Sequence, residues 1–262
     1  MKRGWKSQKA MKKISQVDTA VLLAAGRGTR MGALTALTPK PLLEVGGRAI
    51  LERILGGLAG AGISRAVVVT GYLGEQIERR LGDGGGLGLE IRYARQAQPQ
   101  GTAKALLQAE PFAGSGAFVL GWGDILIEPA FYGELLGEFR RQPCDLLVGV
   151  NEVDDPWQGA AVYVDDTWRV VRMEEKPARG SSTTRWNNAG IFVAAPRLWA
   201  YARRLAPSPR GEYELPQAMA QMIDDGLTVR ALPVRGFWSD VGTPADLEAA
   251  RATFREGGEG PG

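Results

Sequence analysis

The sequence predicts an α/β protein built on a doubly wound, mostly parallel mixed sheet. Two observations lead to this fold class. In the first half of the chain, short apolar runs alternate with segments whose apolar residues recur at helical spacing. The runs are nearly continuous in aliphatic residues, which is typical of strands buried on both faces. At 262 residues, with 44% hydrophobic and 23% charged residues, the chain can bury a sizeable core.

Five runs in the first half are predicted strands, with the sequences TAVLLAAG, RAVVVTGYL, LEIRYARQ, GAFVLGWGD and CDLLVGVNEV. They occupy residues 19–26, 65–73, 89–96, 116–124 and 144–153. Between them, the spacing of apolar residues predicts helices at residues 48–61, 74–82, 101–110 and 128–141.

After residue 150 the pattern changes to α+β. The run GAAVYVDDTWRVVRMEEKP indicates a β-hairpin that turns at residues 165–167, and NNAGIFVAA indicates another strand. Helical spacing predicts three further helices, at residues 196–205, 213–225 and 244–255. Because no proline- or serine-rich linker separates the halves, we predict one domain over residues 19–255, with halves 19–150 and 151–255 on the same sheet.

The basic character of the chain belongs to its first residues. Six of the 32 Lys and Arg residues lie in residues 1–13, which contain no acid, so the remaining 26 are outnumbered by 29 Asp and Glu. We interpret residues 1–18 as a disordered, solvated extension and expect no nucleic-acid partner. No apolar run approaches 18 residues, and the extension lacks the apolar segment of a signal peptide. We therefore expect no membrane partner and a cytoplasmic location.

The chain contains no histidine and a single cysteine, Cys144. This composition excludes disulfide frameworks, zinc sites built from histidine and thiolate, and any catalysis by histidine. It fits a reducing compartment.

A long basic loop follows the first predicted strand, in the stretch LLAAGRGTRMGALTALTPKPLLEVGG. Its third glycine comes one position late for a dinucleotide fingerprint, and its threonines and prolines are expected to keep it out of helix. Ligands bind at the carboxyl edge of such sheets, where the amides of Gly26 and Gly28 and the cations of Arg30 and Lys40 suit phosphate. The alternative is a structural loop with ordinary surface cations.

Several motifs occur in order along residues 19–250: GRGTR followed by PKPL, then RQAQPQGTAKAL, GD, EEKP, NNAGIFV and WSDVGTPADL. This ordered set resembles the sugar-1-phosphate nucleotidylyltransferases, also called NDP-sugar pyrophosphorylases. The resemblance implies a Rossmann-like fold with a sugar-binding α+β insertion. It also implies transfer of a nucleoside monophosphate from a nucleoside triphosphate to a sugar 1-phosphate, with release of pyrophosphate. The attacking phosphate oxygen is ionised at neutral pH, so the absence of histidine is compatible with this reaction.

The resemblance implies a catalytic role for Arg30, Lys40 and Asp124, and Mg²⁺ bound by Asp124 and Asp240. It implies nucleotide contacts from Leu23, Ala25, Gly26, Gly28, Thr29, Gln96, Pro99, Gly101 and Thr102. From the residues alone, Asp124 could instead cap the helix at 128–141, Asp240 could be a turn acid, and Gln96 could belong to a polar loop.

The resemblance implies that the sugar phosphate is bound by Gly159, Glu175, Lys176, Asn188, Gly190 and Glu214. The alternatives are a solvated hairpin end for Lys176, packing for Gly190 and a helix start for Glu214. Trp122, Gln158, Pro216 and Gln217 depart from the common family pattern, which leaves the identity of the sugar open.

Gln96, which precedes the segment PQGTA, resembles the UTP- and dTTP-using members of the family, and the resemblance therefore favours UTP or dTTP, although GTP- and ATP-using members share much of this segment. Three alternatives to this function remain: a cytidylyltransferase for a phospho-alcohol or phosphonate, a non-catalytic subunit that senses sugar nucleotides, and a nucleic-acid binder that uses the basic extension. Retention of Arg30, Lys40, Asp124 and Asp240 favours catalysis over the sensor. The resemblance also allows assembly into homo-oligomers.

Overall fold

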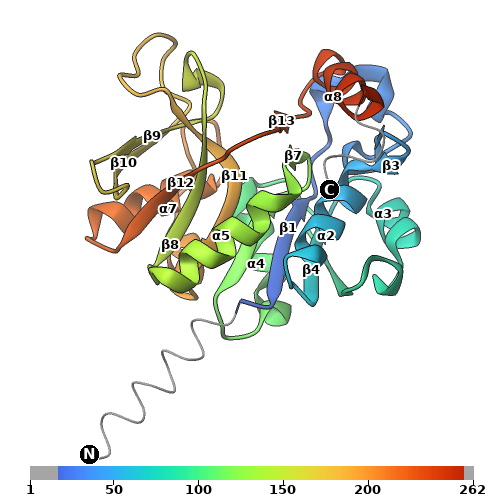
Figure 1. The fold of residues 1–262 in the computed structure, drawn as a ribbon, viewed down its shortest axis with the longest axis horizontal. Helices are drawn as coiled ribbons and strands as arrows, with labels where there is room; N and C mark the ends of the chain where they lie inside the picture. Colours follow the sequence, from blue (N-terminus) through green and yellow to red (C-terminus); the bar gives the residue numbers. More distant parts are fainter. Residues whose placement is uncertain (1–16, 257–262) are drawn as a thin grey trace, which may run out of the picture.

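A mixed sheet of nine strands lies at the centre of the computed structural model, which describes residues 17–256 (Figure 1). Its first-half strands are β1 (Thr19–Ala24), β4 (Arg65–Thr70), β5 (Glu90–Arg95) and β6 (Phe118–Trp122). They lie side by side in the order β6–β1–β4–β5 and all run parallel. The predicted doubly wound α/β class is therefore confirmed.

Four helices accompany these strands: α2 (Ile50–Gly60), α3 (Gly74–Leu81), α4 (Thr102–Ala113) and α5 (Pro129–Arg141). All four were predicted, but some boundaries were wrong. The strand predicted over 65–73 ends at Thr70, because Leu73 adopts a left-handed conformation, with φ of 52°, directly before α3. The helix predicted over 101–110 continues to Ala113 and includes Pro111.

The second half of the chain extends the same sheet. Its strands are β8 (Leu146–Glu152), β9 (Ala160–Val164), β10 (Val170–Glu175), β11 (Trp186–Ala194) and β12 (Val229–Pro233). β11 joins the halves, because it pairs antiparallel with β6 on one side and with β8 on the other. β9 and β10 form the hairpin predicted around residues 165–167. The predicted α+β addition to the sheet is confirmed.

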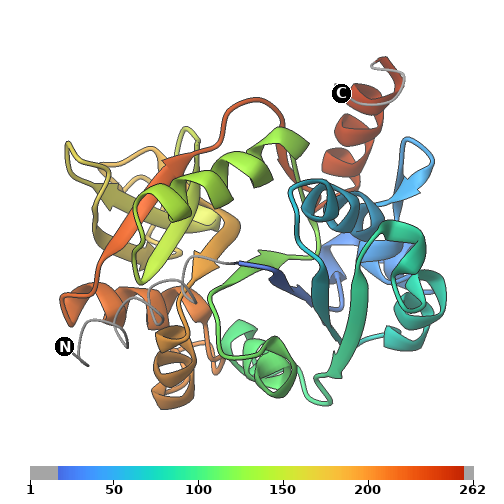
Figure 2. The same cartoon turned by 60° about the horizontal axis from the view of Figure 1, so that its bottom comes forward.

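The helices divide into two layers that cover opposite faces of the sheet (Figure 2). Successive residues of β1 alternate between two apolar cores: Leu22 packs with α2 and α5, whereas Val21 packs with α4. The second core also receives α6 (Arg197–Arg204) and α7 (Leu215–Asp224). Because both faces are covered, the strands are apolar on both sides, which explains their nearly continuous aliphatic sequences.

Two short β-ribbons complete the fold. They were not predicted, because strands of two or three residues are too short to show an alternation of apolar and polar residues. One joins β2 (Glu44–Val45) to β3 (Arg48–Ala49), and the other joins β7 (Ile125–Ile127) to β13 (Trp238–Asp240). In the second ribbon Asp240 pairs with Ile125, and the Val241 amide donates to the Asp124 carbonyl at 3.1 Å. This ribbon brings Asp240 beside Asp124 before the chain enters α8 (Pro244–Glu256).

Two residues assigned to the basic extension lie in the described part of the chain and belong to the fold. Val17 is buried in the first core, and the Asp18 carbonyl accepts hydrogen bonds from the amides of Ser64 and Arg65. The predicted end of the basic extension at residue 18 is therefore too late, and residues 1–16 lie outside the described part. Between residues 17 and 256, no helix combines the length and the hydrophobicity that crossing a bilayer would require.

Candidate active site

The loop after β1 folds into short 3₁₀ turns, η1 (Thr29–Thr35) and η2 (Lys40–Leu42). Sequence reasoning correctly excluded an α-helix here but did not anticipate these turns. Gly28 begins the first turn with φ of 63°, and a Cβ there would lie 3.1 Å from the Lys40 Cβ. The Thr35 hydroxyl donates to the Gly28 carbonyl at 2.9 Å. The glycine therefore allows the loop to close tightly against Lys40.

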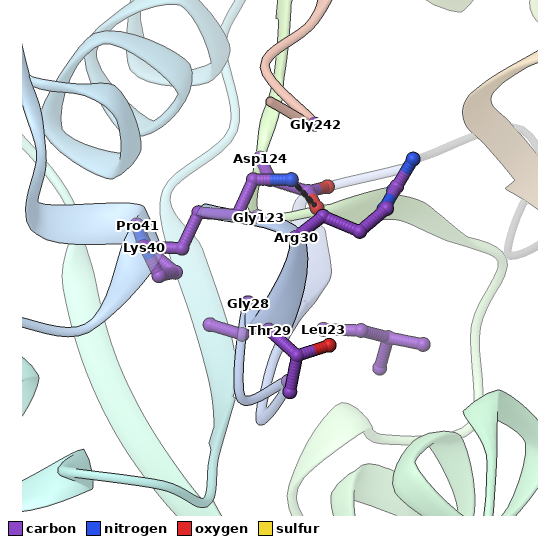
Figure 3. Close-up of a pocket in the computed structure, with 11 residues that line it drawn as sticks. Leu23, Gly28, Thr29, Arg30, Lys40, Pro41, Gly123, Asp124 and Gly242 are labelled. Carbon is purple, nitrogen blue, oxygen red and sulfur yellow. Dashed lines mark hydrogen bonds and ion pairs between the residues drawn. The ribbon is translucent and has the colours of Figure 1, made fainter. Parts of the chain in front are cut away.

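Lys40 joins the loop to the two aspartates. Its Nζ lies 2.7 Å from Asp124 Oδ2 and 3.6 Å from Asp240 Oδ1, and its side chain is only 6% exposed. Figure 3 shows Lys40 and Asp124 meeting over the glycine loop. Asp124 does not cap α5, whose first flanking residue is Glu128 and which has no side-chain cap. The alternative role of Asp124 as a helix cap is therefore wrong.

Arg30 is the more available cation of the loop. Its side chain is 61% exposed, and the one ion pair of its guanidinium with a residue between 17 and 256 is a long contact of 4.0 Å to Asp240 Oδ2. Gly242 packs against this guanidinium, since a Cβ there would be 3.1 Å from its nearest nitrogen. Arg30 is thus positioned over a small residue and can engage an incoming anion.

A cavity of about 200 Å³ opens beside these groups (Figure 3). It is lined by Leu23, Ala24, Gly26, Gly28, Thr29, Arg30, Lys40, Pro41, Gly123, Asp124 and Gly242. Seven of these eleven are residues that the sequence assigned to the nucleotide or to catalysis. The cavity has the glycine loop on one side and cations on another, as expected of a phosphate site.

The two aspartates have the chemistry of a Mg²⁺ site. Burial and the neighbouring Asp124 carboxylate raise the pKa of Asp240, although Lys40 and Arg30 act in the opposite direction. A divalent cation would relieve this repulsion. Within residues 17–256, no group of three acidic, histidine or cysteine side chains forms a complete metal site. Two carboxylates supplemented by substrate phosphates are a usual arrangement for Mg²⁺, so these residues fit the ion.

A second cavity, of about 650 Å³, adjoins the first. Arg30 and Asp124 line both cavities, so the two meet at these residues. Asp240 also lines the second cavity, as do the predicted residues Thr102, Gly159, Glu175, Lys176, Asn188 and Glu214. Residues assigned to the two substrates on sequence grounds are therefore brought to adjoining spaces with Arg30 and Asp124 between them.

The β9–β10 hairpin positions Lys176 and Glu175. The Lys176 amide donates to the Gly159 carbonyl at 2.7 Å, and Lys176 has φ of 45°, which turns the chain sharply after β10. Glu175 lies 3.8 Å from the Arg210 guanidinium, which also forms a close ion pair with Glu214. Burial and the Glu214 charge raise the pKa of Glu175 to about 7. One guanidinium thus serves a half-buried carboxylate, Glu175, and a buried one, Glu214.

The segment before α4 is tied to the segment before α7. The Tyr213 amide donates to the Gln100 carbonyl at 2.9 Å, and the Leu215 amide donates to the Thr102 hydroxyl at 2.8 Å. Gly101 has φ of 102°, and a Cβ there would lie 2.7 Å from the Tyr213 backbone. The glycine at this position is thus required by protein packing.

A family profile described as nucleotidyl transferase matches residues 19–257. The chain belongs to the nucleotidyl transferase family. The resemblance noted in the sequence is thereby confirmed at the level of the family.

Two relatives of this nucleotidyl transferase carry names that describe transfer of a nucleotide to glucose 1-phosphate. The glucose-1-phosphate thymidylyltransferase of Streptomyces antibioticus is 33% identical over 239 residues, which cover 90% of this chain and 66% of that protein. The UTP–glucose-1-phosphate uridylyltransferase AglF of Haloferax volcanii is 33% identical over 241 residues, covering 90% and 96%. A solved UDP-glucose pyrophosphorylase complexed with UDP-glucose has a TM-score of 0.83 at 18% identity, covering 92% and 99%, and shares the fold.

Some predicted site residues of the nucleotidyl transferase line neither cavity: Ala25, Gln96, Pro99, Gly101 and Gly190. Gly190 instead donates its amide to the side chain of Asn188 at 2.9 Å, and Asn188 lines the second cavity.

Sequence reasoning missed Arg210, Gly242 and Trp238, whose indole donates to the Ala189 carbonyl at 3.0 Å. Gly242 and Trp238 flank Asp240 in the motif WSDVGTP, which was a usable signal. Arg210 has no such signal.

The raised pKa of Glu175 predicts a pH-dependent stability. Between its usual value of 4.5 and about 7, the folded state holds a proton that the unfolded state has released, so stability falls as pH rises. We expect the wild type to lose up to about 3 kcal/mol relative to Glu175→Gln across this window. Urea unfolding at several pH values measures the difference. Glu174→Gln, which changes the half-buried neighbour on the same strand, is the control. Parallel pH curves for wild type and Glu175→Gln would contradict the prediction.

Proposed function

We propose that the protein transfers a nucleoside monophosphate from a nucleoside triphosphate to a sugar 1-phosphate, giving an NDP-sugar and pyrophosphate. The observation that carries the proposal is the meeting of the two cavities at Arg30 and Asp124. A triphosphate on the glycine loop and a sugar phosphate near Lys176 would face each other at this junction. The names of the relatives support the same reaction.

In the proposed mechanism, the protein supplies positioning and charge and needs no general base. The sugar phosphate oxygen is already ionised and attacks the α-phosphorus in line with the leaving pyrophosphate. Arg30 would stabilise the charge that develops there, since its guanidinium is free to approach a ligand. Lys40 holds Asp124 and the closed loop in place.

Asp124 and Asp240 would hold Mg²⁺. When bound, the ion neutralises phosphate oxygens and orients the triphosphate. The carboxylates are close together and partly exposed, as a shared cation requires.

Gln96 favours uracil or thymine as the base. Its side-chain amide donates to the Gly101 carbonyl at 3.1 Å, which leaves the carboxamide oxygen able to accept a hydrogen bond. Uracil and thymine present a donor at N3, whereas cytosine presents an acceptor there. This supports UTP or dTTP over CTP and weakens the cytidylyltransferase alternative.

On the sugar side, we propose that Lys176 contacts the phosphate, while Glu175, Glu214 and Asn188 accept hydrogen bonds from the ring substituents. All four line the second cavity. Function in the cytoplasm and assembly into homo-oligomers remain expectations, which fractionation and light scattering can measure.

The reaction can be tested by a screen for pyrophosphate release. The purified protein is mixed with Mg²⁺, each of five nucleoside triphosphates and a panel of sugar 1-phosphates. We expect release with UTP or dTTP only when a sugar 1-phosphate is present. Binding of a nucleotide sugar without any turnover would support the sensor alternative instead.

Lys176→Ala should separate the two substrates. We expect it to weaken sugar 1-phosphate and to leave triphosphate binding, measured alone by calorimetry, nearly unchanged, because Lys176 lines only the second cavity. Arg179→Ala, which alters a nearby cation outside the cavity lining, is the control. If Lys176→Ala abolished nucleotide binding and spared the sugar phosphate, the assignment of Lys176 to the sugar side would be wrong.

A further inference from the structure

Helices α4 and α7 cap each other at their N-terminal ends. The first turn of a helix carries backbone amides that the helix itself cannot bond. In α4 the Ala103 amide donates to the Tyr213 carbonyl at 2.8 Å, and in α7 the Leu215 amide donates to the Thr102 hydroxyl at 2.8 Å. In the described part of the chain, neither helix is capped by the side chain of its own N-cap residue. We call these two hydrogen bonds the reciprocal caps.

The segments that lead into the two helices are exposed and irregular. Residues 97–100 and 209–212 are all exposed, and none of them belongs to a helix or strand except for single turns. The segments contact each other instead: the Tyr213 amide donates to the Gln100 carbonyl at 2.9 Å, and the Lys104 ammonium lies 4.3 Å from the centre of the Tyr213 ring. Segments with little apolar burial have low local stability. The order of each segment therefore depends on its contacts with the other.

These two segments adjoin the residues proposed for different substrates. On the nucleotide side, Gln96 donates its side-chain amide to the Gly101 carbonyl at 3.1 Å, directly before Thr102. On the sugar side, Arg210 forms a close ion pair with Glu214, which lines the second cavity and directly precedes Leu215. The reciprocal caps thus join the base-binding side to the sugar side by a path of a few residues.

We propose that the reciprocal caps make the two substrates bind cooperatively, with Thr102 as the positioning residue for the start of α7. The inference rests on the proposed function and adds a coupling between its two substrates. A nucleotide that orders residues 96–102 also orders residues 213–215, so a sugar 1-phosphate loses less conformational entropy when it binds. Because such coupling is reciprocal, the sugar phosphate raises the affinity for the nucleotide by the same factor.

Hydrogen exchange tests the connection without turnover and without a sugar. The ligands are Mg²⁺ with α,β-methylene-UTP or its dTTP counterpart, in which a carbon bridge replaces the oxygen that the reaction releases. In the wild type, we expect the nucleotide to slow exchange in peptides that cover residues 213–219 by about fivefold or more. In Thr102→Val, which keeps the branched shape but loses the acceptor oxygen, we expect no such slowing, and Thr102→Ser should restore it. If the nucleotide leaves this exchange unchanged in the wild type, the coupling is overturned.

Calorimetry measures the coupling itself. We would determine the Kd of glucose 1-phosphate alone and with saturating methylene analogue, and take the ratio of the two values. We expect Thr102→Val to lower this ratio by about fivefold or more relative to the wild type, and Thr102→Ser to keep it within about twofold. Direct contact and repulsion between the two ligands are the same in every variant, so the comparison isolates the cap.

The matched control is Thr184→Val. It removes a hydroxyl that accepts the Trp186 amide at 3.1 Å within the second half of the chain, so it should leave the ratio unchanged. If Thr102→Val does not fold, Thr102→Ala replaces it. An equal ratio in the wild type and in the folded variant would overturn the role of Thr102.

Failure of the proposed function gives a different result. If neither methylene analogue binds, both the transferase reaction and the coupling are wrong. If the nucleotide and glucose 1-phosphate both bind but the ratio is the same in Thr102→Val, the coupling alone is overturned.

Discussion

Replacing Asp124 with asparagine is expected to lower kcat by about 10²- to 10³-fold while the protein remains folded. The carboxylate contacts Lys40 at 2.7 Å and lies beside Asp240, so it would help to hold the cation that neutralises the phosphates. Asparagine keeps an oxygen that can accept from Lys40 but loses the charge that binds a divalent ion. Steady-state kinetics and far-UV circular dichroism measure activity and folding.

The control for this variant is Asp165→Asn, which changes an acid in the β9–β10 turn. It should retain activity within about twofold, since the turn lies outside both cavities. For the wild type, EDTA should abolish turnover, and added Mg²⁺ should restore it. Activity that survives EDTA would refute the metal assignment.

Arg30→Ala is expected to lower kcat by about 10²- to 10³-fold with a smaller effect on the KM for nucleotide. Arg30 is exposed and weakly paired, so its removal costs little stability, and its effect should come from charge that develops in the transition state. Initial-rate assays at varied nucleotide concentration give kcat and the KM for nucleotide.

Arg27→Ala is the matched control, because Arg27 lies on the same loop but stacks on Tyr72 and does not line the first cavity. It should leave kcat within a few-fold of the wild-type value. If both variants lost activity equally, the cause would be disturbance of the loop. If Arg30→Ala raised only the KM, Arg30 would stabilise the bound substrate and the transition state equally.

Much of the fold could be predicted from local patterns. The strands around Val21 and Val67 are long enough for their aliphatic runs to be recognised, and α2 has a clear apolar face. The β7–β13 ribbon could not be predicted, because its register depends on a pairing between distant segments. It is this ribbon that places Asp240 beside Asp124.

The sequence predicted which residues belong to the site but not the contacts that they make with one another. The motifs named Lys40 and Asp124 separately, and the sequence gives no sign that they form an ion pair. Arg210 was missed because it stands in an irregular segment and acts only through its distant partner Glu175 and its neighbour Glu214. Contacts of this kind depend on tertiary structure, which the periodicity of single elements does not encode.

The contact between Lys40 and Asp124 joins residues 84 positions apart, and Asp240 enters the same cluster from near the end of the described chain. Such distant partners meet only after the intervening sheet has assembled, because closing a long chain segment costs entropy until its contacts form. During synthesis, a growing chain would have to include β13 before this cluster could be complete. Nucleotide capture would then be a property of the finished fold, and partly folded chains would not sequester triphosphates in the cell.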